Sequence, residues 1–555
     1  MRWQPWMTRL SAVLVAGVSL VLCTSCVHLA PAPYDDYLGP FEGVGQPPSA
    51  VTNLRASAPG PHRPAGTPAT RPATAAGPLD LTVPGAVLLA LENNQGLRVE
   101  RLNPPIRRTF EDQERAVFDP VASADLSYGQ QRAAAGGGAG ETTGSATTGT
   151  VSAGGALNTH LPTGADVALE AGATNSDSDP GPDAGSARIG LTFTQALLEG
   201  RGRDVNLASL EQARLDTLTS QYELRGFAES LVAQVEATYW DYFLAERRIG
   251  IYSESLKLAE QQLGETDERI KVGALAETER AAAQAEVALR REALINARSD
   301  LATTHIRLLR LVNPAGADAW AREVTLRDQP PALPAKPDSV EDHVLLALRM
   351  RPDVNQARLG VQQGDLELVK TKNGLLPKLD LFITLGKTGY AESFGRALED
   401  LGGEGYEIVA GLRFSEAVGN RSDRARHQRA LLNREQALEA VANLAQLVQV
   451  DVRSAHIEVN RAAEQVAATQ ATRLLQQEKL RAETEKFRVG RSTSLLVAGA
   501  QRDLVASQIA EVEAQVNHLK ALIDLFRLDG SLLQRRGIAA PGREPVHLAV
   551  QPDAP

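Results

Sequence analysis

The sequence predicts a mainly α-helical protein with a β-barrel part, built from a duplicated helix-strand-strand-helix repeat. Two halves of the 555-residue chain share five short sequence anchors in the same order. Segments of about ten residues in each half alternate apolar and polar side chains, as half-exposed β-strands do. Long Ala/Leu/Glu/Arg/Gln-rich runs follow residue 200 and carry apolar residues at helical spacing. Together these observations favour long helices joined to amphipathic strands.

The N-terminus is predicted to be a targeting segment, residues 1–26. Arg2 and Arg9 precede an apolar core at residues 10–22. This core is shorter than the about 20 residues that a membrane-spanning helix needs. The residues before Cys26 resemble a bacterial lipoprotein cleavage site, which would leave Cys26 as the lipidated first residue. An ordinary secretory signal cut nearby is the alternative. A Pro/Ala/Gly-rich linker, residues 27–79, follows.

Composition argues against several function classes. The formal net charge is -10 and no dense basic patch occurs, so we expect no nucleic-acid partner. Both cysteines lie in the targeting segment, so no disulfide framework is expected in the body. The nine histidines form no HExxH or Cys/His cluster, and no phosphate-binding loop is present. We therefore expect no enzyme activity, no cofactor and no metal site, and interpret Tyr239, Trp240 and Tyr242 as packing residues.

The repeat divides the chain. VLLALENNQGLRVERL (87–102) aligns with residues 344–359, and FDP (118–120) with LLP (375–377), at an offset of 257; GLTFTQA (190–196) aligns with GLRFSEA (411–417) at 221. KVG (271–273) matches RVG (488–490), and LLRL (308–311) matches LFRL (525–528), both at 217. We expect a first repeat at 80–312 with an extra loop or hairpin at about 132–187, a connector at 313–338, a second repeat at 339–537 and a flexible tail at 538–555.

Each half is predicted to run in the same order. A helix of about 25 residues precedes a strand, a loop and a second strand; a very long helical stretch, a Val-Gly break and a helix of about 35 residues follow. The strands of about 9–10 residues have the length of tilted membrane strands. The predicted strand segments are 122–130, 188–194, 379–386 and 406–415. The extra hairpin, around 149–174, either extends the strands beyond the outer surface or forms an external flap.

The helices carry apolar seams. The residues step by three and four, which buries such a stripe against a neighbouring helix. The two seams are Leu294, Ala297, Leu301, Thr304, Leu308 and Leu311, and Ile509, Val512, Val516, Leu519, Ile523 and Phe526. The run from Asp204 to Lys271 would be about 100 Å long at 1.5 Å per residue. On this feature alone, any coiled coil would fit.

Four strands per chain cannot close a barrel, and an open sheet edge cannot lie in lipid. The edges must therefore pair with other copies, and three copies would give about twelve strands, more than the eight that leave no channel. The sequence thus predicts a homo-oligomeric barrel whose strands continue into a bundle of long helices.

This pattern resembles the TolC-like outer-membrane factor family over about residues 80–537. The LLALENN and LLALRMRP openings, the ATYWDYFLAERR helix and the two Val-Gly breaks carry the resemblance. It implies a homotrimer in the bacterial outer membrane, with a twelve-stranded β-barrel continuous with a long coiled-coil α-barrel in the periplasm; the predicted lipid on Cys26 would make the chain lipid-anchored there. It also implies a passive exit duct of a tripartite efflux or type I secretion system. The partners would be outer-membrane lipid, a periplasmic adaptor (membrane fusion) protein and an inner-membrane RND, ABC or MFS transporter.

The resemblance places adaptor-docking tips at the two Val-Gly breaks. A glycine tolerates the left-handed conformation that ends helices, and Thr493 or Ser494 could cap the next helix. The alternative is a turn without a partner. The tip residues are Val272, Gly273, Ala274, Leu275, Glu277 and Thr278, and Val489, Gly490, Arg491, Ser492, Thr493 and Ser494.

The periplasmic entrance departs from the family pattern. Family members often place acidic residues beyond the second tip glycine, but residues 495–499 contain none. Glu277 and Glu279 could form the constriction instead, or they could be solvated surface charges. A second function class stays open, a non-pore periplasmic or surface coiled-coil scaffold lipoprotein. It would explain the heptads and the signal peptide, but not the matched alternating strands.

Overall fold

The computed structural model describes residues 78–134, 145–179, 183–314, 319–331 and 338–548. The predicted signal peptide with Cys26 and nearly all of the linker lie outside the described residues. Within those ranges, no helix combines the length and the apolar character that a membrane crossing requires.

Each half opens with broken helices rather than the single helix that the sequence predicted. The first half has α3 (Val83–Asn93), α4 (Gln95–Glu100) and α5 (Asn103–Arg115); the second has α9 (Val340–Met350) and α10 (Pro352–Asn373). Asn94 is extended, and its side chain accepts a hydrogen bond from Leu97 N, so it ends one helix and caps the next. Arg351 is extended because it precedes a proline, which disfavours helical backbone at the preceding residue.

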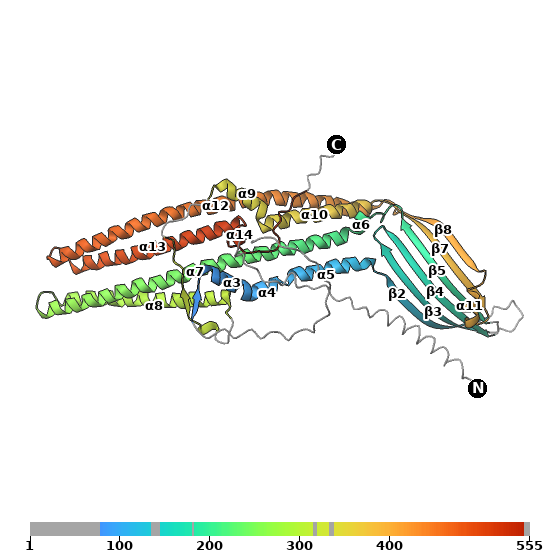
Figure 1. Cartoon of the computed structure of the whole chain (residues 1–555), viewed down its shortest axis with the longest axis horizontal. Helices are drawn as coiled ribbons and strands as arrows, with labels where there is room; N and C mark the ends of the chain where they lie inside the picture. The colour runs from blue at the N-terminus through green and yellow to red at the C-terminus, as the bar shows by residue number, and fades with distance from the viewer. Residues whose placement is uncertain (1–77, 135–144, 180–182, 315–318, 332–337, 549–555) are drawn as a thin grey trace, which may run out of the picture. The chain divides into compact units, whose positions relative to one another are not determined.

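The prediction of four strands per chain is wrong. Six strands form one antiparallel sheet in the order β2-β3-β4-β5-β7-β8 (Figure 1). They are β2 (Val121–Ala134), β3 (Ser145–Leu161), β4 (Ala165–Asp179), β5 (Ala184–Ala196), β7 (Lys378–Ala391) and β8 (Tyr406–Ser415). The extra hairpin is β3 and β4, and it pairs between β2 and β5 inside the sheet, so the predicted external flap is wrong. A count of twelve strands from three copies no longer follows.

β8 has the predicted bounds, Tyr406–Ser415, but the other strands are longer than predicted, with 17 residues in β3 and 14 in β7. Pairing with neighbours extends them through Thr, Ser and Gly residues that alternation alone did not mark as strand. A short helix, α11 (Phe394–Asp400), packs on β5 and β7. A separate parallel pair joins β1 (Leu79–Leu81) to β6 (Val324–Leu326).

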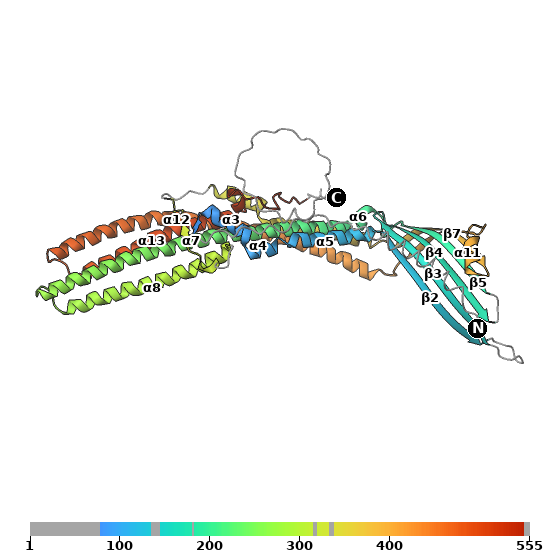
Figure 2. The same cartoon turned by 60° about the horizontal axis from the view of Figure 1, so that its bottom comes forward.

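Two long helical hairpins follow the strands. The first is α7 (Ala208–Lys271) with α8 (Thr278–Val312), after the short α6 (Arg203–Asn206); the second is α12 (Arg421–Arg488) with α13 (Ser494–Leu528), before the short α14 (Leu532–Arg535). Helices α7 and α13 also pack together, so the hairpins lie side by side (Figures 1 and 2). The 68 residues of α12 span about 100 Å at 1.5 Å per residue.

The main core lies where these hairpins meet the small parallel sheet. The predicted seams contribute to it, with Leu308, Val516 and Ile523 buried. Tyr239, Trp240 and Tyr242 are also buried, as predicted for packing residues. Helix α8 ends at Asn313 (φ 44°) and α13 ends before Gly530 (φ 71°), two left-handed caps at matching repeat positions.

Candidate functional site: the hairpin tips and the two sheet faces

Both long hairpins reverse at a glycine with left-handed backbone. Gly273 has φ 75° and Gly490 has φ 76°. At the first tip Ala274 N donates to Arg269 O (2.8 Å), and at the second Arg491 N donates to Lys486 O (2.8 Å). These bonds span the glycine as in a Schellman motif, which satisfies the last carbonyls of a helix. The predicted helix reversal at both Val-Gly breaks is confirmed.

The two tips begin their second helices differently. Thr493 Oγ1 accepts a hydrogen bond from Leu496 N (3.3 Å), so Thr493 caps α13. Glu277 precedes α8 and makes no side-chain cap bond. The matched turns therefore share the glycine but not the cap.

The tips contact one another. Ser494 Oγ donates a hydrogen bond to Glu279, and the guanidinium of Arg269 lies 5.1 Å from the centre of the Phe487 ring. Glu277 is mostly exposed, 3.6 Å from Arg280. Glu279 is thus hydrogen-bonded to the neighbouring hairpin, whereas Glu277 is exposed and pairs with Arg280 of its own hairpin. Docking at the tip residues and a constriction at these two glutamates remain predictions.

The sheet has one apolar and one polar face across all six strands. Register partners share a face, so the pairing traces each face from strand to strand. The apolar face includes Leu126 and Tyr128 of β2, Val151 and Leu157 of β3, Val167 and Leu169 of β4, Leu191 and Phe193 of β5, Ile383 and Leu385 of β7, and Ile408 and Leu412 of β8. The opposite face includes Asp125 and Ser127, Thr150 and Ser152, Asp166 and Glu170, Arg188 and Thr192, Asp380 and Thr384, and Glu407 and Arg413.

Two ionised groups on the polar face pair across the sheet. Arg188 of β5 reaches Glu407 of β8 at 2.9 Å, over Gly386 of β7. The remaining charges named on that face are mostly acidic, which favours cations in a confined polar space.

The outer edges of the sheet are open within the described chain. β2 pairs only with β3, and β8 only with β7. The helices next to these edges also expose apolar stripes that the sequence analysis missed. Ile106 and Phe110 lie one turn apart on α5, before β2. On α12, after β8, an exposed stripe (the α12 stripe) recurs on one helical face: Leu432, Leu447, Val450, Ile457 and Leu475.

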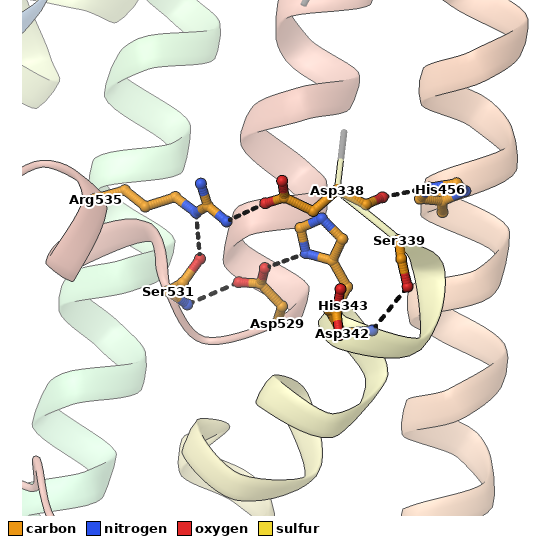
Figure 3. Close-up of polar contacts among 8 residues, drawn as sticks. All are labelled: Asp338, Ser339, Asp342, His343, His456, Asp529, Ser531 and Arg535. Carbon is orange, nitrogen blue, oxygen red and sulfur yellow. Dashed lines mark hydrogen bonds and ion pairs between the residues drawn. The ribbon is translucent and has the colours of Figure 1, made fainter. Parts of the chain in front are cut away.

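A polar joint ties α9 to the end of α13 (Figure 3). His343 Nδ1 lies 2.7 Å from Asp529 Oδ2, and both side chains are buried. Asp529 also accepts from Ser531 N, and Arg535 donates to Ser531 Oγ at 3.0 Å. These contacts link the first turn of α9 to the residues that follow α13. Among the described residues, no group of three or more His, Cys, Asp or Glu is placed to hold a metal ion.

A buried ion pair lies on α7. Arg225 Nε donates to Glu229 Oε1 (3.1 Å), and Arg225 also donates to the carbonyl oxygens of Gly530 and Gly542. Burial raises the pKa of Glu229 to about 7, against the opposing pull of Arg225.

The described chain thus combines an amphipathic β-sheet that has two open edges with two duplicated helical hairpins. A family model described as outer membrane efflux protein matches residues 165–313 and 344–531. The chain belongs to this outer membrane efflux protein family, and the resemblance to TolC-like proteins is confirmed.

Relatives and solved structures agree. The outer membrane efflux protein BepC of Brucella suis biovar 1 (strain 1330) is 26% identical over 350 residues, 62% of this chain and 72% of BepC. The outer-membrane channel OprN has TM-score 0.61 at 18% identity, covering 81% of this chain and 89% of OprN. The open-state MtrE outer membrane channel of Neisseria gonorrhoeae has TM-score 0.57 at 18% identity, covering 81% and 89%. The structural matches show a common fold.

Proposed function

We propose that this protein is the outer-membrane channel of a tripartite efflux or type I secretion system. Copies of the chain close a barrel in the outer membrane, and the helical hairpins extend it through the periplasm. The duct is passive: the energy comes from an inner-membrane RND, ABC or MFS transporter, reached through a periplasmic adaptor. A lipid on Cys26 anchors the chain beside the barrel.

The observation that carries the proposal is the six-stranded sheet with one apolar face, one polar face and two open edges. In lipid, an unpaired strand edge leaves backbone groups unsatisfied at several kcal/mol each, so only a closed barrel is viable there. The apolar face suits hydrocarbon and the polar face suits a wet lumen. A coiled-coil scaffold without a pore has no use for such a sheet.

The edges suit self-association in a ring. β2 runs away from the helices and β8 runs back toward them, so β8 of one copy and β2 of the next would pair antiparallel, as the other strands do. The same contact would lay the α12 stripe along the next copy, with its first residue, Leu432, at about the level of Ile106 and Phe110 of α5. This head-to-tail contact closes as a cyclic oligomer, and we propose a homotrimer.

The helix tips are the proposed docking site. Val272 and Val489 are exposed beside the two glycines, and Leu495 and Leu496 extend an apolar surface at the second tip. Small apolar patches on a hairpin end suit insertion into a complementary partner tip. Three copies of Glu277 and Glu279 form the proposed constriction and favour cations.

Extraction and conductance test the channel. Outer-membrane extracts should yield heat-resistant trimers that conduct ions in planar bilayers. The Cys26→Ala variant should lose its lipid yet stay in the membrane, because the barrel holds it. A soluble monomer or dimer released by that substitution would contradict the proposal and favour the scaffold.

Cross-linking tests the docking site separately. A cysteine introduced by Leu275→Cys or Arg491→Cys should capture an adaptor in intact cells when a thiol-reactive cross-linker is added. A cysteine introduced by Leu289→Cys, exposed on α8 away from the tip, is the matched control. Equal capture at the control position would refute tip docking while leaving the channel intact.

A further inference from the structure

We propose that the hairpin β3–β4 forms part of the barrel wall that lies in the membrane. This hairpin is present in the first half and has no counterpart in the second. On the trimer proposed above, on which this inference rests, the barrel then has about eighteen strands, six from each chain. The outer-membrane section of the duct is accordingly wider than three copies of the second half's pattern would make it.

Strand pairing places the hairpin inside the sheet. Along its whole length β2 pairs with β3, from Val121 with Asn158 to Ala134 with Ser145. β4 pairs with β5 from Ala165 with Gln195 to Ser176 with Ala184. An external flap would leave β2 beside β5, as β7 lies beside β8 in the second half. Here two strands separate them.

The apolar and polar side chains of the hairpin lie on the same two faces as those of the neighbouring strands. Leu157 of β3 is the register partner of Leu169 of β4, which is the partner of Leu191 of β5. All three therefore lie on the apolar face, while the neighbouring Ala168 and Glu170 lie on the polar face. A one-residue slip would have put the leucines on the wet side. A flap in water needs no such match.

The turn between β3 and β4 is fastened to the junction of strands and helices. Gly164 O accepts from Ala196 N (3.1 Å), and Thr163 O accepts from Gly202 N (3.2 Å). Gly164 has φ 81°, and a Cβ there would lie 2.0 Å from Gly200 O. The hairpin therefore starts at the same level as the other strands, held by backbone contacts that require a glycine.

The added strands change the size of the pore. Barrel diameter grows roughly linearly with strand number, so eighteen strands give about 1.5 times the diameter of twelve. With strands about 4.8 Å apart and tilted about 40°, the backbone diameter rises from about 24 Å to about 36 Å. Barrels of 16–18 strands leave an open aqueous channel. The barrel in the outer membrane would then not be the part of the channel that limits the diameter of an exported molecule.

Disulfide trapping tests the strand order in the assembled protein. Cysteines from Leu169→Cys and Leu191→Cys, register partners on β4 and β5, should cross-link on mild oxidation. Cysteines from Leu126→Cys and Ala187→Cys lie on β2 and β5, about 14 Å apart across three strand spacings, beyond disulfide reach. The first pair linking and the second not linking is the expected result. The reverse result places β2 beside β5 and overturns the inference.

Pore size tests the consequence. Deleting residues 145–179 removes β3 and β4 and leaves both halves with two strands. The size cut-off for neutral polymers entering from the outer side should fall by about one third in diameter, in step with the loss of six strands from eighteen. Deletion trimers with an unchanged cut-off would overturn the inference.

A matched charge pair covers the case in which the deletion does not assemble. Leu169→Arg puts a charge on the lipid side of the hairpin and should abolish most of the trimer in the outer membrane. Ala168→Arg, one residue away on the polar side, should leave the trimer level close to wild type. Equal yields would mean that the hairpin is outside the wall. Absence of wild-type trimers would instead refute the proposed channel.

Discussion

The two halves of the repeat end their long helices in the same way but differ in the number of strands that they contribute. Both reverse at a left-handed glycine, and both close their last helix with a left-handed residue, Asn313 or the glycine at 530. The first half, however, contributes four strands to the sheet and the second only two. The two halves therefore keep the same helical frame but differ in the number of strands that they add to the sheet.

The long helices differ in the same way. Helix α7 buries aromatic residues and charged ones, among them Arg225, Glu229 and Glu236, against its own chain. Helix α12 buries only alanine and valine and leaves the α12 stripe exposed. Helix α7 is thus packed within its own chain, and α12 offers a surface that a neighbouring copy would cover.

The largest effect is expected from a substitution in the exposed α12 stripe, which should prevent trimer formation. Ile457 is 67% exposed in the single chain, so Ile457→Asp should leave the chain folded. In the proposed ring it would bury an unpaired carboxylate at each of the interfaces, a cost of several kcal/mol per site. Trimers should be lost on native gels while the helical circular dichroism stays. Gln470→Asp, an exposed charge on the other side of α12, should keep the trimer; equal loss would argue against the α12 interface.

The second effect falls on the hairpin that only the first half has. Gly164→Ala forces a side chain against Gly200 O in a left-handed backbone, which we expect to cost about 3 kcal/mol from strain and overpacking together. Gly129→Ala is the control, because a Cβ there meets nothing within 4 Å. Thermal melting of the trimer measures both. A Gly164 variant as stable as the Gly129 variant would mean that the turn is not fixed to the helix junction.

The α12 stripe and the β3–β4 hairpin illustrate which features the sequence could predict and which it could not. The duplication, the helix reversals at Gly273 and Gly490 and the apolar seams were predictable, because each is a local or periodic signal. The place of β3 was not, because its small residues, such as Gly154 and Gly155, blur the alternation and because pairing joins distant segments. The α12 stripe was missed since exposure becomes visible only when the chain's own contacts are known. The split at Arg351 was readable in principle from the following proline.

The third effect concerns a buried charge on α7, of a kind that α12 lacks. The pKa of Glu229 is about 7 in the folded protein and 4.5 without burial, so folding favours its protonated form. This stabilisation is fully present below pH 4.5 and is lost as the pH rises to about 7, a change of about 3 kcal/mol. Glu229→Gln should flatten the fall in melting temperature between pH 5 and 7.5. Glu223→Gln, exposed on the same helix, should not; parallel slopes for wild type and the Glu229 variant would rule out this titration.

The smallest effect is a difference in stability between the two hairpin tips, of which only the second has a capping side chain. Thr493→Ala removes the hydroxyl that caps α13 and should cost about 1 kcal/mol, the usual value of a lost N-cap. Glu277→Ala at the matched position of the first tip removes no cap bond and should change the stability of the folded chain by less than about 0.5 kcal/mol. Hydrogen exchange of the first turn of α13 against that of α8 resolves such local changes, because exchange follows the opening of each helix end. Faster exchange in α13 alone would show that the tips, alike at their glycines, differ in how firmly each holds its second helix. Equal acceleration in both would mean that the two hairpin ends open as one unit, coupled through Ser494 and Glu279.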